Sequence, residues 1–295
     1  MLSLLSKRVL VSIHIFLISL WIGTLVNILL LHLLKQQLYS VFQIEILDKI
    51  VFTLFDSIII NVSIAVAISG LLFSIYTNWG FVKFYWIMTK WALLLLLAIM
   101  IIFLASPAIN GMASFSDVFK ENVLYQEQYL QFENQSFLYI VIQLVTLILI
   151  VFISVFKPWG QRRTNRKMNR KIVVSSGIII LLILISMVIL QYIQLTHYRN
   201  LKINEINLQT IDDGRYVGKV DYAFEYEIEV YIMNHTIKDI KILRNRDSHY
   251  ARLAEGIKYK VLREQKINID SVTGATTTSQ ILLKAMEAAI VNPTK

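Results

Sequence analysis

Long apolar runs separated by short polar segments make up the first two thirds of the chain. A helix that spans a membrane needs about 20 predominantly apolar residues. Five segments meet this requirement: 9–34, a stretch within 51–76, 86–105, 137–156 and 172–195. The first run is too long for a cleavable signal peptide and lacks a small-residue cleavage site. The pattern therefore predicts a membrane protein whose N-terminal part is an all-α bundle of five transmembrane helices.

From about residue 196 the pattern becomes that of a small folded domain. Residues 225–232 (EYEIEVYI) alternate polar and apolar positions, which is the period of a strand with one buried face. Asn234-His235 is a plausible turn, and Ile240 and Ile242 continue the alternation beyond it. We therefore expect at least one β-hairpin in this domain.

Two helices are expected in the same domain. The segment 248–256 has the composition of a short helix, and 280–290 (QILLKAMEAAI) that of a longer one. Ser279 or a nearby threonine would be the N-cap of the longer helix. With a further turn at Asp213-Gly214, these elements predict a small α+β domain over 196–295.

The net charge of +9 is concentrated in one segment. Residues 157–171 (KPWGQRRTNRKMNRK) include seven Lys/Arg and no Asp/Glu. Such a run can bind nucleic acid, but between two apolar segments it is typical of a cytoplasmic loop that obeys the positive-inside rule. The sequence thus predicts contact with the lipid bilayer and no nucleic-acid partner.

The other loops fix the predicted orientation. Lys7 and Arg8 precede the first predicted span, and the segment 106–136, expected as a loop, is acidic. An N-terminus in the cytoplasm satisfies all three charge patterns, and five spans then place the C-terminal domain outside the cytoplasm. The predicted organisation is a four-helix transmembrane domain (1–160), a basic cytoplasmic loop (161–171), a fifth transmembrane helix (172–195) and an extracytoplasmic domain (196–295).

Composition excludes several kinds of site. The chain is 56% hydrophobic with a mean hydropathy of +0.59, too apolar for a soluble enzyme of this length. The absence of cysteine excludes disulfides, thiolate metal sites and cysteine nucleophiles. The sequence has no paired-carboxylate site, Ser–His–Asp arrangement or dinucleotide-binding glycine loop that would indicate a hydrolase or an NAD-dependent enzyme.

The segment 270–279 (DSVTGATTTS), called the hydroxyl loop below, allows two interpretations. Hydroxyl side chains and a glycine before a helix serve as a cap and a tight turn. The same arrangement presents several N–H donors and a partial positive charge, which suits a phosphate group. No lysine follows the glycine, so a nucleotide-triphosphate loop is a poor fit.

The order of residues in the hydroxyl loop resembles a known motif. Asp270-x-x-Thr273-Gly-Ala-Thr276 is similar to the flavinylation motif of the FMN-binding domain family, which includes the C subunit of sodium-translocating NADH:quinone reductase and the G subunit of the Rnf complex. The resemblance covers roughly 201–292. It implies that a flavin transferase joins the phosphate of FMN to the Thr276 hydroxyl through a phosphoester bond, with Asp270 and Thr273 at the transferase's recognition positions. The remaining cofactor-binding candidates are Gly274, Ala275, Thr277, Thr278 and Ser279.

The residues that contact the flavin ring are not identified by the motif. Tyr222 and Tyr250 are aromatic candidates for stacking on it, and the competing interpretation is that they belong to the ordinary core or surface of the domain. No catalytic residue is predicted.

Two histidines in the first predicted span are candidate haem ligands. His14 and His32 are 18 residues apart, which is five turns of helix, so they share a face and stand roughly 27 Å apart. Neither has a histidine in another predicted span to pair with, so haem at His14 would need a methionine, a lysine or a second subunit. The alternative is that both histidines form hydrogen bonds within the bundle.

The predicted spans also resemble a loosely defined group of small four-helix bacterial membrane proteins, some of which handle haem or copper. The resemblance rests on His14, Trp21-Ile-Gly23, Thr77-Asn-Trp-Gly80, Lys90-Trp91 and Lys157-Pro-Trp-Gly160. The tryptophans would serve equally as interfacial anchors, so this resemblance carries no function across.

Together these features indicate a multi-pass protein of a bacterial cytoplasmic membrane that carries covalent FMN and relays electrons at the outer face, as a component of an electron-transfer chain. Its partners would be a flavin transferase, a redox donor and a redox acceptor. One alternative is a transmembrane electron conduit with haem in the helical bundle. Another is a non-enzymatic FMN-binding sensor or assembly module.

Overall fold

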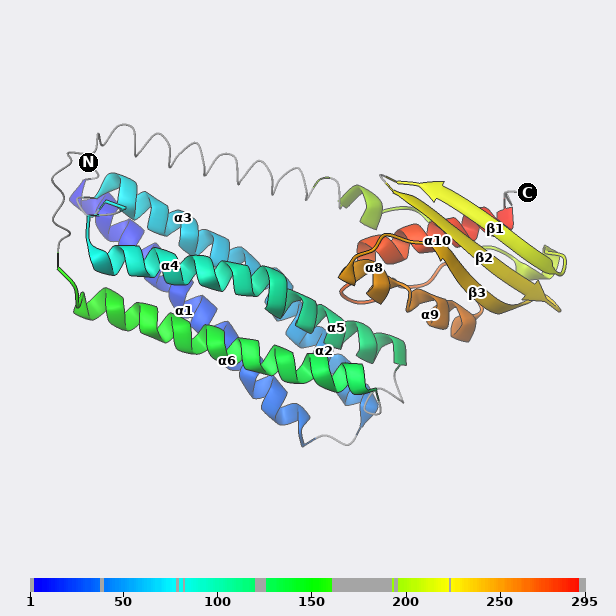
Figure 1. The fold of residues 1–295 in the computed structure, drawn as a ribbon, viewed down its shortest axis with the longest axis horizontal. Coiled ribbons are helices and arrows are strands. Elements are labelled where there is room, and N and C mark those ends of the chain that lie inside the picture. The colour runs from blue at the N-terminus through cyan, green and yellow to red at the C-terminus, as the bar shows by residue number, and fades with distance from the viewer. Residues whose placement is uncertain are drawn as a thin grey trace. The chain divides into compact units, whose positions relative to one another are not determined.

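The computed structural model describes most of the 295-residue chain: 3–37, 40–77, 80–81, 83–119, 126–160, 193, 196–222 and 224–291 (Figure 1). These residues belong to two compact units. Unit 1 comprises Met1–Ile109 and Leu130–Ser186, and unit 2 comprises Asn110–Tyr129 and Met187–Lys295.

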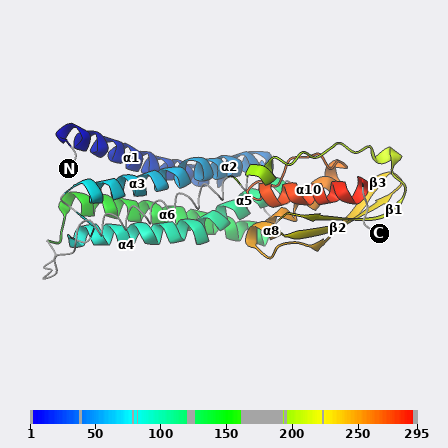
Figure 2. The same ribbon diagram turned by 90° about the horizontal axis from the view of Figure 1, so that it is seen from above.

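Unit 1 is built of long helices that lie alongside one another in both views (Figures 1 and 2). Its helices are α1 (Leu4–Lys35), α2 (Val41–Leu54), α3 (Ile60–Tyr76), α4 (Tyr85–Met100) and α6 (Glu127–Phe156). A π-helical turn, η1 (Phe55–Ile59), joins α2 to α3 without a break, and a second, η2 (Ile101–Ala105), joins α4 to α5 (Ser106–Phe119), which continues into unit 2.

Four helices of the described chain are long and apolar enough to cross a membrane: Leu4–Lys35, Phe42–Tyr76, Tyr85–Phe119 and Glu127–Phe156. They correspond to the first four predicted spans, and each is longer than predicted. The predicted fifth span (172–195) and the basic loop (161–171) lie outside the described residues, apart from Ile193.

The prediction of an acidic loop over 106–136 was wrong for most of its length. Helix α5 occupies Ser106–Phe119, and α6 begins at Glu127. Two of the acidic side chains that led to this prediction form ion pairs. Glu133 pairs with the buried Lys35 at 2.9 Å, and Asp117 pairs with the buried Lys260 at 3.3 Å. Lys35 also pairs with the buried Asp48 of α2 at 2.7 Å. A helix can contain charged residues when they are paired. The helices therefore continue past the apolar runs, and the fall in hydropathy did not coincide with the helix ends.

The sheet of unit 2 is a three-stranded antiparallel meander in the order β1 (Gly214–Asp221), β2 (Glu225–Met233), β3 (Thr236–Arg244). The predicted alternation in β2 is confirmed, because Tyr226, Ile228, Val230 and Ile232 are all buried. The predicted turn at Asn234-His235 is also confirmed. Both residues have positive φ (53° and 56°), as a type I′ hairpin turn requires.

Helix α10 (Thr276–Val291) packs on β1 and β2, α9 (Ile257–Glu264) packs on β3, and α8 (His249–Ala254) packs against α10. A short 3₁₀ turn, η4 (Leu208–Thr210), precedes the sheet. Ser248 caps α8, since its hydroxyl accepts a hydrogen bond from the Ala251 N–H at 3.2 Å. The short helix predicted over 248–256 therefore corresponds to α8.

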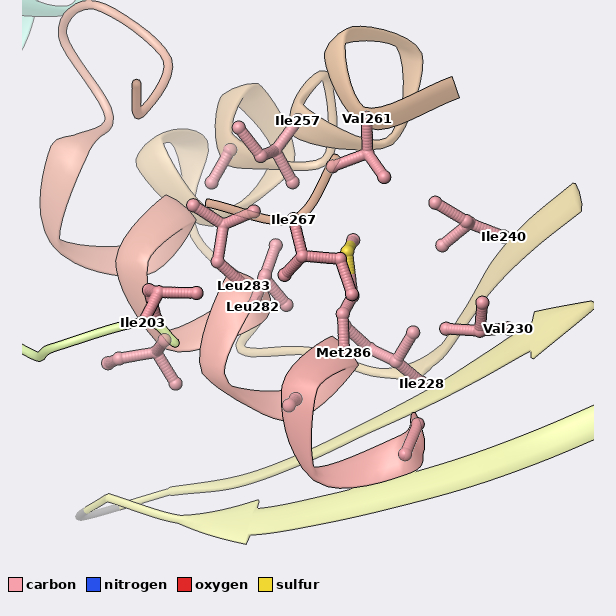
Figure 3. Close-up of a cluster of buried hydrophobic side chains, with 14 of the residues drawn as sticks. Ile203, Ile228, Val230, Ile240, Ile257, Val261, Ile267, Leu282, Leu283 and Met286 are labelled. Atoms are coloured by element: carbon pink, nitrogen blue, oxygen red, sulfur yellow. The ribbon is translucent and has the colours of Figure 1, made fainter. Parts of the chain in front are cut away.

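Helix α10 supplies the centre of the core of unit 2 (Figure 3). Leu282, Leu283 and Met286 point from α10 toward the branched side chains of the sheet and of α9 (Figure 3). At Gly218 in β1, an added Cβ would lie 2.2 Å from the Ala285 carbonyl oxygen. The helix therefore rests directly on the backbone of the strand, which fixes the position of the hydroxyl loop at its N-terminal end.

Candidate functional site

The hydroxyl loop contains a tight turn immediately before α10. The Ala275 N–H donates to the Val272 carbonyl oxygen at 3.0 Å, and Gly274, at the third position of the turn, has a φ of +79°. These are the features of a type II turn, whose third position favours glycine because it needs a positive φ. The glycine of the motif is thus explained by the backbone conformation.

Helix α10 begins at Thr276, four residues earlier than predicted. Its first intrahelical hydrogen bond runs from the Ser279 N–H to the Ala275 carbonyl oxygen at 3.1 Å. The expected N-cap was therefore wrong: Ala275 precedes the helix, and Ser279 lies inside its first turn. Three consecutive threonines, with weak intrinsic helix propensity, read as loop in the sequence.

Ser279 ties the turn to the helix instead of capping it. Its buried hydroxyl donates to the Ala275 carbonyl oxygen at 3.0 Å and accepts from the Val272 N–H at 3.3 Å. Because the first N–H groups of a helix have no intrahelical partner, the N–H groups of Thr276, Thr277 and Thr278 remain as donors at the helix N-terminus. They provide a partial positive charge at the turn.

Some hydroxyl groups of the loop form hydrogen bonds within the protein and others do not. Those of Ser271, Thr273, Thr277 and Ser279 form hydrogen bonds to other groups of unit 2. Within the described part of the chain, those of Thr276 and Thr278 have no partner. Thr278 is buried, whereas Thr276 is half-buried and Asp270 is exposed. Thr276 is thus the partly accessible threonine of the loop whose hydroxyl is uncommitted.

A buried carboxylate from far upstream in the chain holds the turn. Within unit 2, Asp117 Oδ2 accepts hydrogen bonds from both the N–H and the hydroxyl of Thr273, each at 2.9 Å. Lys260 Nζ lies 3.3 Å from both oxygens of Asp117 and donates to the Ser271 carbonyl oxygen at 3.3 Å. Both charged side chains are buried. Thr273, predicted to be a recognition residue, is therefore fixed on both its backbone and its side chain.

Two further residues of the same upstream segment contact the turn. Ser114 Oγ donates to the Thr273 carbonyl oxygen at 2.5 Å, and an added Cβ at Gly274 would lie 2.8 Å from Asn110 Oδ1. Sequence reasoning missed these residues together with Asp117 and Lys260. They are separated from the loop by up to some 160 positions, and no local pattern marks them.

The segment that leads into the sheet runs along α10 from its N-terminal end. Arg199 Nε donates to Thr277 Oγ1 at 3.3 Å, Gln280 Nε2 to the Leu201 carbonyl oxygen at 2.9 Å, and Asn204 Nδ2 to Glu287 Oε1 at 2.6 Å. The exposed guanidinium of Arg199 thus adds a positive charge beside the N–H groups of α10. Sequence reasoning missed Arg199 as well.

The two aromatic candidates for a flavin contact lie in ordinary packing environments. The Tyr222 ring meets the Tyr198 ring edge-on at 5.7 Å and packs against the core, and the Tyr250 ring meets the His249 ring at 5.4 Å. For Tyr222, no contact with the hydroxyl loop occurs within the described part of the chain. Nearby in β2, burial raises the pKa of the Tyr226 phenol above its ordinary value.

Residues 222–291 match the FMN-binding domain family. Unit 2 contains an FMN-binding domain. The resemblance seen in the hydroxyl loop is thereby confirmed at the level of the domain, which follows helices apolar enough to span a membrane. No curated protein and no solved structure gives a significant match to the chain.

The FMN-binding domain presents groups that fit the phosphate of FMN. The N–H groups at the N-terminus of α10 and the Arg199 guanidinium are the donors that a phosphate prefers. Neither Asp117 nor Lys260 is a free group at this surface, because each is buried and bonded to the other. The site can therefore hold an anion at Thr276 without a lysine in the loop.

The histidines of unit 1 both have hydrogen-bond partners. His14 Nδ1 lies 2.6 Å from Ser69 Oγ, and His32 Nε2 lies 3.1 Å from Ser136 Oγ. No group of three or more His, Cys, Asp or Glu side chains suited to a metal ion occurs among the described residues. These contacts agree with the expectation that the histidines bond within the bundle, and each involves one of the two ring nitrogens.

Proposed function

We propose that the protein is a membrane-anchored flavoprotein that carries FMN covalently on Thr276 and relays electrons at the outer face of the cytoplasmic membrane. The observation that carries the proposal is the position of Thr276. It is the first residue of α10 in an FMN-binding domain, and its hydroxyl is uncommitted and partly accessible.

Attachment would be a phosphoryl transfer to Thr276 Oγ1. A bond forms between Oγ1 and the phosphorus of FMN, and the bond between that phosphorus and its leaving group breaks. The hydroxyl proton passes to a base of the transferase. Because a free phosphate monoester has no good leaving group, the donor must be an activated form of FMN such as a phosphoanhydride. Asp270, which is exposed, is open to contact by the transferase.

Once attached, the phosphate diester keeps one negative charge next to the N-terminus of α10. The N–H groups of Thr277 and Thr278 and the Arg199 guanidinium are placed to stabilise it. The isoalloxazine ring of FMN supplies the redox chemistry, and the domain supplies position and electrostatics. A covalent tether also prevents loss of the cofactor by dilution in an extracytoplasmic compartment.

The decisive experiment is in-gel flavin fluorescence of the denatured full chain, made in cells that export a flavin transferase. We expect fluorescence in the wild type and in Thr278→Val, and none in Thr276→Ala. Thr278→Val is the matched control, because it removes a neighbouring hydroxyl that has no partner within the described chain and keeps the backbone N–H and the buried volume of the side chain. Intact mass should show one FMN per chain, less one water.

Two results would overturn the proposal: fluorescence that persists in Thr276→Ala, or a dark wild type when a control substrate of the transferase is labelled. A dark wild type that still binds FMN reversibly would favour the sensor or assembly module. That alternative is supported by the same N–H donors, which can hold a phosphate without a covalent bond.

A further inference from the structure

Unit 1 contains a cavity of about 530 Å³ between α1, α3, α4 and α6, and we call it the bundle cavity. This volume lies in the range of small-molecule and cofactor sites. Its walls are mainly apolar and include the rings of Phe73, Trp86 and Trp91. A cavity of this kind suits a flat, largely apolar ligand.

Two ammonium groups stand at the bundle cavity. Lys90 Nζ lies 5.4 Å and Lys157 Nζ 5.9 Å from the centroid of the same Trp86 ring. The residues that line the cavity include no Asp or Glu. Within the described chain, neither lysine has a carboxylate at ion-pair distance. Lys90 is half-buried and Lys157 is exposed, so together they offer two positive charges at the mouth of the cavity to a ligand with two negative charges.

His14 also lines the bundle cavity, and its contact with Ser69 is compatible with the tautomer that a metal ligand needs. Ser69 Oγ lies 2.9 Å from the Val66 carbonyl oxygen, which can only accept. When the Ser69 hydroxyl donates to that carbonyl, Ser69 Oγ accepts from His14 Nδ1–H at 2.6 Å, and the lone pair is then on His14 Nε2. A metal-ligating histidine is commonly oriented in this way by a partner on its other nitrogen.

We propose that the bundle cavity binds one haem, with His14 Nε2 as an axial ligand of the iron and Lys90 and Lys157 paired with the two propionates. Haem has a group to match each feature of the cavity. Its flat ring matches the apolar walls, its iron can be ligated by an imidazole lone pair, and its two carboxylates can pair with the two lysines. A phospholipid carries no metal for His14 Nε2 to ligate, and a quinone carries no negative charge to pair with the lysines.

His32 does not take part. It does not line the bundle cavity, it is buried, and its Nε2 is already within hydrogen-bond distance of Ser136 Oγ. The proposal therefore gives one haem per chain and not two. It goes beyond the flavin function of unit 2 and uses none of the residues of that unit.

The test is the absorbance spectrum of the full chain purified in detergent from haem-replete cells. We expect a Soret band and about one haem per chain by the pyridine haemochrome method in the wild type and in His32→Ala. In His14→Gly the haem content should fall at least about tenfold, and added imidazole should restore the band.

Ser69→Ala should lower haem affinity by about 10–100-fold, the usual effect of losing a partner of a metal ligand. Lys90→Gln/Lys157→Gln should also retain less haem.

A wild type without a Soret band would overturn the proposal, as would a band that survives in His14→Gly without imidazole or is lost in His32→Ala. An anionic lipid retained by the wild type in place of haem, measured by native mass spectrometry, would have the same consequence. Rescue by imidazole separates loss of the ligand from loss of the fold. Thr276→Ala should keep the Soret band, so the haem and flavin proposals can fail independently.

Discussion

At Gly218 the backbone of α10 meets the backbone of β1, with no room for a side chain. An added Cβ would lie 2.2 Å from the Ala285 carbonyl oxygen and 2.3 Å from the Ala289 nitrogen. Both are backbone atoms, so the helix itself would have to move. The start of α10, which carries Thr276, would move with it.

We therefore expect Gly218→Ala to lower the free energy of unfolding by about 3 kcal/mol or more, the upper part of the range for overpacking. The measurement is thermal or urea unfolding of the full chain in detergent, followed through the FMN-binding domain. Gly214→Ala in the same strand is the matched control, because its Cβ would meet only the Tyr216 side chain at ordinary contact distance. Equal stability of the two variants would contradict the prediction.

Tyr226 gives the FMN-binding domain a sensitivity to high pH. Its folded-state pKa is raised by burial, and its pKa in the unfolded chain is about 10. The buried phenol therefore contributes stability that is complete below pH 10 and is lost as the pH rises above this value, because only the unfolded chain ionises readily there.

Tyr226→Phe, which cannot ionise, should lose less stability between pH 8 and pH 10.5 than the wild type. Unfolding midpoints at the two pH values measure the difference. Parallel losses in both proteins would show that other groups account for the effect.

At the scale of elements, the turn before α10 is held by a buried ion pair between α5 and α9. Removing only Asp117 leaves the Lys260 ammonium buried without a counter-ion and the Thr273 N–H without an acceptor. Breaking one side of a buried pair typically costs about 3–5 kcal/mol, whereas replacing both charges by apolar groups costs much less.

We therefore expect Asp117→Leu to destabilise the domain strongly and Asp117→Leu/Lys260→Met to recover part of the loss. A double-mutant cycle with Lys260→Met, measured by urea unfolding, gives the coupling energy. A double variant no more stable than Asp117→Leu would contradict the role assigned to the pair.

The elements were predicted to different extents, for physical reasons. Strand β2 and its turn were predicted well, because a strand with one buried face has alternating polar and apolar residues. The first four predicted spans coincide with long apolar helices but were predicted too short, in part because Lys35 and Asp48 are buried as an ion pair and Glu133 also pairs with Lys35. The start of α10 was misplaced because its three threonines have weak intrinsic helix propensity and the core that holds the helix is a tertiary feature. For the same reason the sequence marked Thr273 but not Asp117, which holds it.

At the scale of the whole molecule, the absence of cysteine makes the predicted topology directly testable. The positive-inside rule places 157–171 in the cytoplasm and the C-terminal domain outside it. A cysteine introduced at Asn234, in the exposed hairpin turn, should react with a membrane-impermeant maleimide in intact cells.

A cysteine introduced at the exposed Trp159 should react only after the membrane is opened, and it serves as the matched control. Labelling with the opposite sidedness would place the FMN-binding domain in the cytoplasm. That result would remove the basis for an electron relay at the outer face while leaving flavin attachment to be judged separately.

The segment 199–204, which lies along α10, has a further consequence for which redox partners could approach a flavin on Thr276. These residues start beside Thr277 and follow α10 away from it, so Thr276 lies at the end of the domain where the chain arrives from residue 196. If FMN is attached to Thr276 and the predicted fifth span ends at 195, only a short segment of chain separates the cofactor from the membrane surface. Electron exchange would then favour partners that diffuse within the plane of the membrane over bulky soluble proteins.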